Sequence, residues 1–407
     1  MFLSAISNLF GVGGASVIAR ALGSGDHDRV RRAAAFAFWG CLAMTLLYSL
    51  LAFAARDLFV NLLGGTDRAV HNNAVRYLMC TVVLGGAVTS MSVLLSHLIR
   101  SEGRALCASI GVALGGILNI ALDPLFMFVL LPPGQEALGA AVATTLSNAV
   151  SLLYFAAVLL HLRSRSRLAF APSAAMLKEQ IPASVLAAGL PACVMTLFEN
   201  ISYAVLDKLM SLAGLPMQAG IGVAKKVNML AHCIVRGIAQ GSLPLIAYTY
   251  AAGNWKRMRA SIRVSHAAAV GTALLCMAIN LIFAGPMTEI FIHSESSSLL
   301  YGTAFLRILC IGGPLSASAY TFISFFQATG EGKRSFFLAV LRKGLVDIPL
   351  MFLLSSLIPI YGIVWATPIA DALCCLTANL MFRSYVCCLP DQGRRLPGWK
   401  HASKCTG

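Results

Sequence analysis

An amide and a carboxylate lie one helical turn apart inside a hydrophobic stretch of the sequence. The stretch from Asn119 to Thr144 reads NIALDPLFMFVLLPPGQEALGAAVAT. Because Asn119 and Asp123 are four residues apart, a helix would project both side chains from one face. Thr144 adds a hydroxyl group on the next predicted helix. The face that carries Asn119 and Asp123 can hold a cation.

The cost of placing Asp123 in a membrane favours a functional role. A carboxylate at membrane depth costs at least ~2.5–3.5 kcal/mol on insertion scales, and such groups usually face a cavity or an ion path. In the alternative interpretation, Asp123 caps a helix end or is paired inside a bundle, because Pro124 directly after it can break the helix.

A second carboxylate, Glu199, lies in the apolar segment TLFENISYAV. An isolated carboxylate in such surroundings takes up a proton at neutral pH unless it is paired, which suits a proton-coupled site. Arg236 lies well inside another apolar segment, and an ion pair between the two residues would make both structural. The two interpretations do not exclude each other.

Two further carboxylates lie in apolar segments. Asp371, in WATPIADALCC, is as deep as Asp123 and either takes a direct part in the site or makes hydrogen bonds inside the bundle. Asp347, close to Pro349, is expected to be a polar residue that faces other helices. The histidines lack ligand spacing, and no GxxxxGK[ST] motif occurs, which argues against a metal cofactor and against an ATP-driven pump.

The composition identifies the class of protein that positions these groups. The chain has 407 residues, of which 58% are hydrophobic and 12% are charged, and its mean hydropathy is +0.78. These values predict an all-α polytopic membrane protein. The net charge of +15 arises from basic residues in alternate loops rather than from one patch, so it indicates membrane orientation and not nucleic-acid binding.

Apolar runs of the length that spans a ~30 Å hydrocarbon layer recur along the chain. They predict eleven transmembrane helices, near residues 2–22, 33–54, 75–96, 105–131, 138–160, 184–206, 217–247, 262–284, 302–327, 335–357 and 361–385. The loops with many basic residues are expected in the cytoplasm, together with the basic tail at the C-terminus.

The longest polar interruption divides the chain into two lobes. It covers residues 161–182 and is predicted to be a cytoplasmic linker. We therefore expect an N-lobe of five helices at residues 1–160, a C-lobe of six helices at residues 183–387, and a basic cytoplasmic tail at residues 388–407.

The two lobes repeat each other in sequence. A constant shift of 228 residues relates FGVGGASVIARALGSGDHDRVRR to AQGSLPLIAYTYAAGNWKRMR and pairs Gly25 with Gly253. A shift of 223 relates LGAAVATTLSNA to YGIVWATPIADA; it pairs Thr144 with Thr367 and Asn148 with Asp371. Two pseudo-symmetric helix bundles of this kind are a transporter architecture, with the site within or between the lobes.

At this level of detail the chain resembles a known family. The segments GVGGASVIARALGSGD, NIALDP and IAQGSLPLIAYTYAAGNWKR resemble the multidrug and toxic compound extrusion (MATE) family of antiporters, and the resemblance covers nearly the whole chain. It implies two six-helix bundles that alternate between inward-open and outward-open shapes and expel organic cations in exchange for Na⁺ or H⁺, without a cofactor.

The resemblance also implies roles for particular residues. Asn119, Asp123 and Thr144 match the amide, carboxylate and hydroxyl of the family's N-lobe ion site, which makes them possible Na⁺ ligands. That site also uses an Asp on the family's first helix, which has no counterpart because this chain begins where the second helix begins. Glu199 matches an acidic residue of the C-lobe, whereas GGPLSASAYTFISFF lacks the Asp that some members have there. Both differences leave the coupling ion open.

The predicted function is therefore secondary active export of cationic or amphipathic molecules by a monomer, multi-pass in the plasma membrane and, by expectation, the bacterial inner membrane. Asn119, Asp123, Thr144, Glu199 and Asp371 are the candidate residues of the coupling site and cavity. Three alternatives compete with this prediction. The first is a truncated, transport-deficient relative without the first helix. The second is a lipid-linked oligosaccharide flippase, which would need more helices and a cavity rich in Arg and Lys. The third is an intramembrane enzyme, which would need motifs such as DDxxD or HExxH that the sequence lacks.

Overall fold

The computed structural model describes residues 2–62, 68–132, 134–162, 166–172, 174–178, 180–292 and 296–387. Within these residues every regular element is helical. Helices satisfy their backbone hydrogen bonds internally, as spanning segments in hydrocarbon must. The predicted tail at residues 388–407 and parts of the predicted linker lie outside the described residues.

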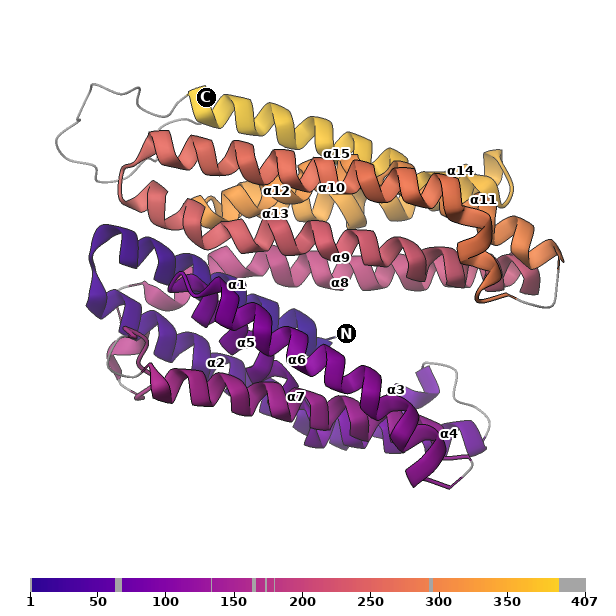
Figure 1. Ribbon diagram of the computed structural model, residues 1–407, viewed down its shortest axis with the longest axis horizontal. Helices are drawn as coiled ribbons and strands as arrows, with labels where there is room; N and C mark the ends of the chain where they lie inside the picture. Colours follow the sequence, from indigo (N-terminus) through magenta and orange to yellow (C-terminus); the bar gives the residue numbers. More distant parts are fainter. Residues whose placement is uncertain are drawn as a thin grey trace.

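The first part of the chain forms one helix bundle (Figure 1). Its elements are α1 (Phe2–Ser24), α2 (His27–Ala54), the short α3 (Arg56–Leu62), α4 (Arg68–Leu78), the π-helical turn η1 (Met79–Leu84), α5 (Gly86–Ser101), α6 (Ala105–Pro124), the π-helical turn η2 (Leu125–Leu130) and α7 (Glu136–His161).

A single 3₁₀ turn, η3 (Ala174–Leu177), leads to the second bundle. Its elements are α8 (Ile181–Ala213), α9 (Leu215–Ala251), α10 (Trp255–Glu289), α11 (Ser296–Ile311), α12 (Gly313–Thr329), α13 (Gly332–Val340), the π-helical turn η4 (Leu341–Asp347), α14 (Ile348–Leu357) and α15 (Tyr361–Cys387).

The internal repeat appears in the structure as two matching turns. Gly25, between α1 and α2, has φ +79°, and Gly253, between α9 and α10, has φ +69°. Both positions need the left-handed backbone that glycine adopts most easily. Asp26 and Asn254 follow them, and each side chain accepts a hydrogen bond from the backbone N–H three residues further on, at 2.9 and 3.0 Å. Each turn is therefore an N-cap built in the same way.

Ten of the eleven predicted spans coincide with apolar helices, although two of them are not continuous. Eight single helices are long and apolar enough to cross a membrane, and two bent helix pairs bring the number to ten in the described part of the chain. The predicted spans near 75–96 and 302–327 bend by 49° and 41°. The breaks fall at Gly85 and at the Gly312–Gly313 pair, where the absence of a side chain permits a kink.

The one remaining predicted span, near 335–357, is helical but is not among these ten apolar helices and helix pairs. It comprises α13, η4 and α14, and it carries Arg342, Lys343 and Asp347 in its middle. All three side chains are buried within the protein. A span with this many charges depends on its neighbours for stability in a membrane.

The two bundles meet along α1, which contacts α8, α9 and α12. Backbones approach closely there: a Cβ atom at Gly189 would overlap the carbonyl oxygen of Leu9. Further along α1, the Ser16 hydroxyl donates to the carbonyl oxygen of Gln327 at 2.6 Å. Figure 1 shows the bundles close together at the end with the α1–α2 turn and farther apart at the end with α4 and α11.

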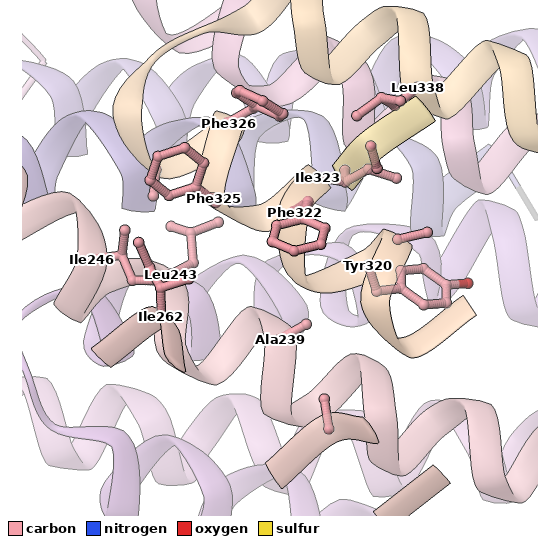
Figure 2. Close-up of a cluster of buried hydrophobic side chains, with 14 of the residues drawn as sticks. Ala239, Leu243, Ile246, Ile262, Tyr320, Phe322, Ile323, Phe325, Phe326 and Leu338 are labelled. Carbon is pink, nitrogen blue, oxygen red and sulfur yellow. The ribbon is translucent and has the colours of Figure 1, made fainter. Parts of the chain in front are cut away.

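The core of the second bundle is a cluster of aliphatic and aromatic side chains from α9, α10, α12 and α13 (Figure 2). Leu243, Ile262, Phe325 and Leu338 meet there, all at most 4% exposed. Tyr320 lies in the same cluster, and its hydroxyl group points away from the other labelled side chains. The core thus fixes the position of a polar group at its edge.

Candidate functional site

The structure brings Asn119, Asp123 and Thr144 together at one point between α6 and α7. The Asn119 Nδ2 donates to Asp123 Oδ1 at 3.0 Å and to Thr144 Oγ1 at 3.4 Å. Asn119, Asp123 and Thr144 are half-buried. A 180° rotation of the Asn119 amide would turn its carbonyl oxygen toward the same point, so that three oxygen atoms face it. Hard cations prefer ligands of this type.

The local backbone around this group is irregular. Pro124 ends α6, and the π-helical turn η2 follows directly. Because proline has no backbone N–H, the carbonyl group of Ile120 loses the partner that a regular helix would give it. Both predicted features of the segment therefore occur: the helix geometry changes at Pro124, and the amide and carboxylate still share one face.

A cavity of about 310 Å³ lies one helical turn from this group, between the lobes. Asn148 lines it and donates to the Thr144 carbonyl oxygen at 3.0 Å. The remaining walls come from α1, α5, α6 and α9, including Asn8, Arg100 and Arg236. The cation-binding candidates are thus next to a space that both lobes enclose.

A larger cavity of about 450 Å³ shares Asn8 and Arg236 with the first one. Its walls are α1, α8 and α9, and its polar lining includes Asn8, Glu199, Asn200, Asp207, Lys225 and Arg236. The Asn8 amide donates to the Thr196 hydroxyl across the lobes at 3.0 Å. A cavity with charged groups of both signs and apolar side chains fits a small amphipathic molecule.

Glu199 forms an ion pair with Arg236 in this cavity. The Arg236 Nη2 lies 2.6 Å from Glu199 Oε1 and 2.9 Å from the Tyr320 hydroxyl. Tyr320 in turn donates to Glu199 at 3.3 Å. Glu199 is therefore not an isolated carboxylate, and the ion-pair interpretation describes its surroundings.

Asp207 and Lys225 form a second pair in the same wall, but this pair is open to the cavity. Lys225 Nζ lies 2.5 Å from Asp207 Oδ1, and the Asp207 side chain is 46% exposed. Lys225 Nζ also lies 5.3 Å from the centre of the Tyr203 ring.

Asp371 is deeper, and it pairs with a cation that the sequence interpretation did not consider. Arg342 Nε donates to Asp371 Oδ1 at 2.6 Å, and each side chain is only 1% exposed. The Arg342 guanidinium also lies over the Tyr320 ring, 4.3 Å from its centre. Tyr320 therefore connects the Arg342–Asp371 pair to the Glu199–Arg236 pair.

Asp347 forms a third buried pair, with Lys343 of its own helix. Lys343 Nζ lies 2.8 Å from Asp347 Oδ2, and the hydroxyls of Ser202 and Thr367 donate to the same carboxylate at 2.6 and 3.1 Å. The expectation that Asp347 is only a polar residue facing other helices was incomplete, because it omitted the ammonium group. The run RKGLVD in an apolar segment was the sequence signal for buried pairs.

The predicted residues therefore form two groups. Asn119, Asp123 and Thr144 form one group in the N-lobe, and Glu199 and Asp371 belong to the ion-pair network of the C-lobe. No cluster of three or more His, Cys, Asp or Glu side chains occurs among the described residues. The groups that could coordinate an ion at Asp123 are a carboxylate, an amide and a hydroxyl. These ligands suit a weakly held ion better than a transition metal.

Comparisons with known proteins agree on one family. The MatE family model matches residues 1–125 and 191–370. The multidrug export protein MepA of Staphylococcus saprophyticus is 27% identical over 379 residues, which cover 93% of this chain and 82% of that protein. MepA of Staphylococcus aureus strain MRSA252 is 26% identical over 381 residues, with the same two coverages.

Solved structures show the same fold. A crystal structure of a MATE protein in complex with MaL6 has a TM-score of 0.85 at 24% identity and covers 95% of this chain and 86% of its own. An outward-facing multidrug resistance MATE transporter has a TM-score of 0.85 at 23% identity, with coverages of 95% and 85%. Since the family model matches most of the chain and these structures share its two-bundle fold, the chain belongs to the MatE family of multi-pass membrane transporters for multidrug efflux.

Proposed function

We propose that this protein is a secondary active exporter that exchanges organic cations or amphipathic drugs for Na⁺ or H⁺ by alternating access. Asn119, Asp123 and Thr144 bind the coupling ion, and the cavity between the lobes binds the substrate. The protein acts as a monomer in the plasma membrane, which we expect to be a bacterial inner membrane. Its basic loops and its C-terminus lie in the cytoplasm.

The observation that carries the proposal is the missing counter-charge at Asp123. Away from the ends of the spans, every other carboxylate in the described residues has a basic partner: Glu199 has Arg236, Asp207 has Lys225, Asp347 has Lys343 and Asp371 has Arg342. Asp123 is hydrogen-bonded only to the neutral Asn119 amide in the described residues. An intramembrane carboxylate without a cation is costly, so it favours binding an ion or a proton.

The coupling follows from where the ion binds. A bound ion can shift the equilibrium between two conformations only by the difference in its affinity for them. The Asn119–Asp123–Thr144 group lies one turn from a cavity that both lobes line. A change in how the lobes pack would therefore alter access to the carboxylate, which gives the ion different affinities in the two states.

Substrate binding is supported by the larger cavity. A cationic group entering it can reach Asp207, whose carboxylate is the more exposed of the two in the lining. The substrate would then compete with Lys225 for the carboxylate, while apolar lining residues such as Met229 contact its hydrophobic part. Glu199 accepts hydrogen bonds from both Arg236 and Tyr320, so it is less available to a substrate cation.

The function is tested with purified protein in proteoliposomes loaded with a fluorescent cationic dye. An imposed Na⁺ or proton gradient should drive the dye across the membrane against its own concentration gradient. Protein-free vesicles and vesicles without an ion gradient are the controls. Dye movement that only follows the dye's concentration gradient, whichever ion gradient is imposed, would refute the exchange mechanism.

A further inference from the structure

The ion-binding group of the N-lobe has a counterpart in the C-lobe. A shift of 224 residues places NIALD over KGLVD, so Asn119 corresponds to Lys343 and Asp123 to Asp347. Thr144 corresponds to Thr367 in the next repeat segment, at a shift of 223. In both lobes the polar pair is four residues apart on one helix, and the threonine comes from the next long helix.

The C-lobe group has the same three members in contact, but the threonine has a different partner: Thr144 accepts a hydrogen bond from Asn119, whereas Thr367 donates to Asp347. Thr367 Oγ1 lies 3.1 Å from Asp347 Oδ1, and Lys343 Nζ lies 2.8 Å from Asp347 Oδ2. In the N-lobe, the Asn119 amide occupies the place of the ammonium group, 3.0 Å from Asp123 Oδ1. The C-lobe group differs in burial, since Lys343 and Asp347 are 2% and 0% exposed.

We propose that the ammonium group of Lys343 is a tethered substitute for the coupling ion, which keeps the C-lobe copy of the ion site permanently closed. The proposal rests on the proposed ion site at Asp123. It has two consequences. This C-lobe copy of the site exchanges no ion during transport, and replacing Lys343 with asparagine, the residue of the N-lobe repeat, creates a second site for Na⁺ or a proton.

The charge balance around Lys343 explains why an ion would enter. The charged and titratable groups that interact with it are Asp347, Asp371, Arg342 and Tyr203, together with Glu199, which Arg236 pairs, and His232. Arg342 is held by Asp371 at 2.6 Å, so its charge is already balanced. Without Lys343, Asp347 would be a buried carboxylate with only neutral hydroxyl partners. Such a group requires a cation or takes up a proton.

Lysine is well suited to this role. Its ammonium is a compact point charge on a flexible stem, comparable to a small monovalent ion and unlike a planar guanidinium. Lys343 Nζ also lies 5.7 Å from the centre of the Tyr203 ring, whose negative face adds a favourable interaction with a cation. An ion in the N-lobe can leave, whereas the lysine stays attached.

The test measures ion-linked stability, which needs no transport. Melting temperatures of the detergent-solubilised full chain are compared in NaCl and in choline chloride at equal ionic strength, at pH 5.5 and 8. A ligand that binds only the native state raises the melting temperature with its concentration. The Asp123→Asn variant should show no Na⁺- or acid-linked rise, and adding Lys343→Asn should restore a rise of several degrees. The matched control adds Asp347→Asn as well and should lose it again.

A second measurement covers the case in which Lys343→Asn does not fold. Removing the whole pair as Lys343→Met with Asp347→Leu should leave the ion-gradient dependence of dye transport unchanged, because this pair holds no exchangeable ion. Loss of that dependence would overturn the proposal, as would a folded Lys343→Asn variant without any ion-linked rise. Failure of the Asp123 site alone would appear differently: Asp123→Asn would keep its ion-linked stability, while the Lys343→Asn gain would still be present.

Discussion

Replacing Asp371 with asparagine tests whether the C-lobe charges are structural. The change leaves the Arg342 guanidinium, 1% exposed, without its carboxylate. At the 2.6 Å separation, Coulomb's law with an effective dielectric constant of about 20 gives an attraction of about 6 kcal/mol, part of which offsets the cost of burying both ions. Removing one partner of a buried pair typically costs about 3–5 kcal/mol, and we expect a loss of that size.

The assay is thermal unfolding in detergent, followed by size-exclusion chromatography, on three variants. Asp371→Asn should melt well below the wild type. The double variant Asp371→Leu with Arg342→Met removes both charges and should recover most of the stability. Asp207→Asn, which breaks an exposed pair, should change stability by about 0–1 kcal/mol. An Asp371→Asn protein as stable as the wild type, or a double variant no better than the single one, would refute the reasoning.

Three further predictions concern the lobes and their sites. Glu199→Gln removes the negative charge that balances Arg236, so it should lower expression and stability. Arg236→Gln in the same chain should rescue both, and no rescue would contradict the ion-pair assignment. Gly189→Ala introduces a methyl group that overlaps the Leu9 carbonyl oxygen, so it should separate α1 from α8. A cysteine introduced at Ser16, in a background without other reactive thiols, should then be alkylated faster. An unchanged rate would show that the contact is not needed for closure. Thr144→Val removes one neutral oxygen from the ion site. It should weaken the apparent ion affinity by about fivefold, which corresponds to one hydrogen bond of about 1 kcal/mol, and it should leave maximal transport unchanged. Complete loss of transport would contradict this minor role.

Much of the architecture could be predicted because it depends on local sequence. Apolar run length located the spans, and the repeat paired Gly25 with Gly253, which the structure places in two matching turns. The i,i+4 spacing of Asn119 and Asp123 was enough to place both on one face, and the structure adds the contact with Thr144. These inferences required only helix geometry and the thickness of a membrane.

Only part of the C-lobe network could be predicted: the Glu199–Arg236 pair was one interpretation of the sequence, and Lys343 and Asp347 are four residues apart on one helix. The other links join residues far apart in the chain. Asp371 and Arg342 are 29 positions apart, and Glu199 and Tyr320 are 121 apart. Spacing along one helix gives no information on such pairs. The kinks at Gly85 and Gly312 were also missed, since glycine is equally compatible with close helix packing and with a bend.

The most direct test of the central claim compares ion-driven dye transport by the wild type and Asp123→Asn in proteoliposomes at equal protein content. Glu136→Gln is the control, because this carboxylate lies at the start of α7 and accepts a hydrogen bond from the Gly134 backbone N–H. The wild type and the control should respond to an imposed Na⁺ or proton gradient, and Asp123→Asn should respond to neither. A wild-type response from a folded Asp123→Asn protein would contradict the assignment of the coupling ion to the N-lobe.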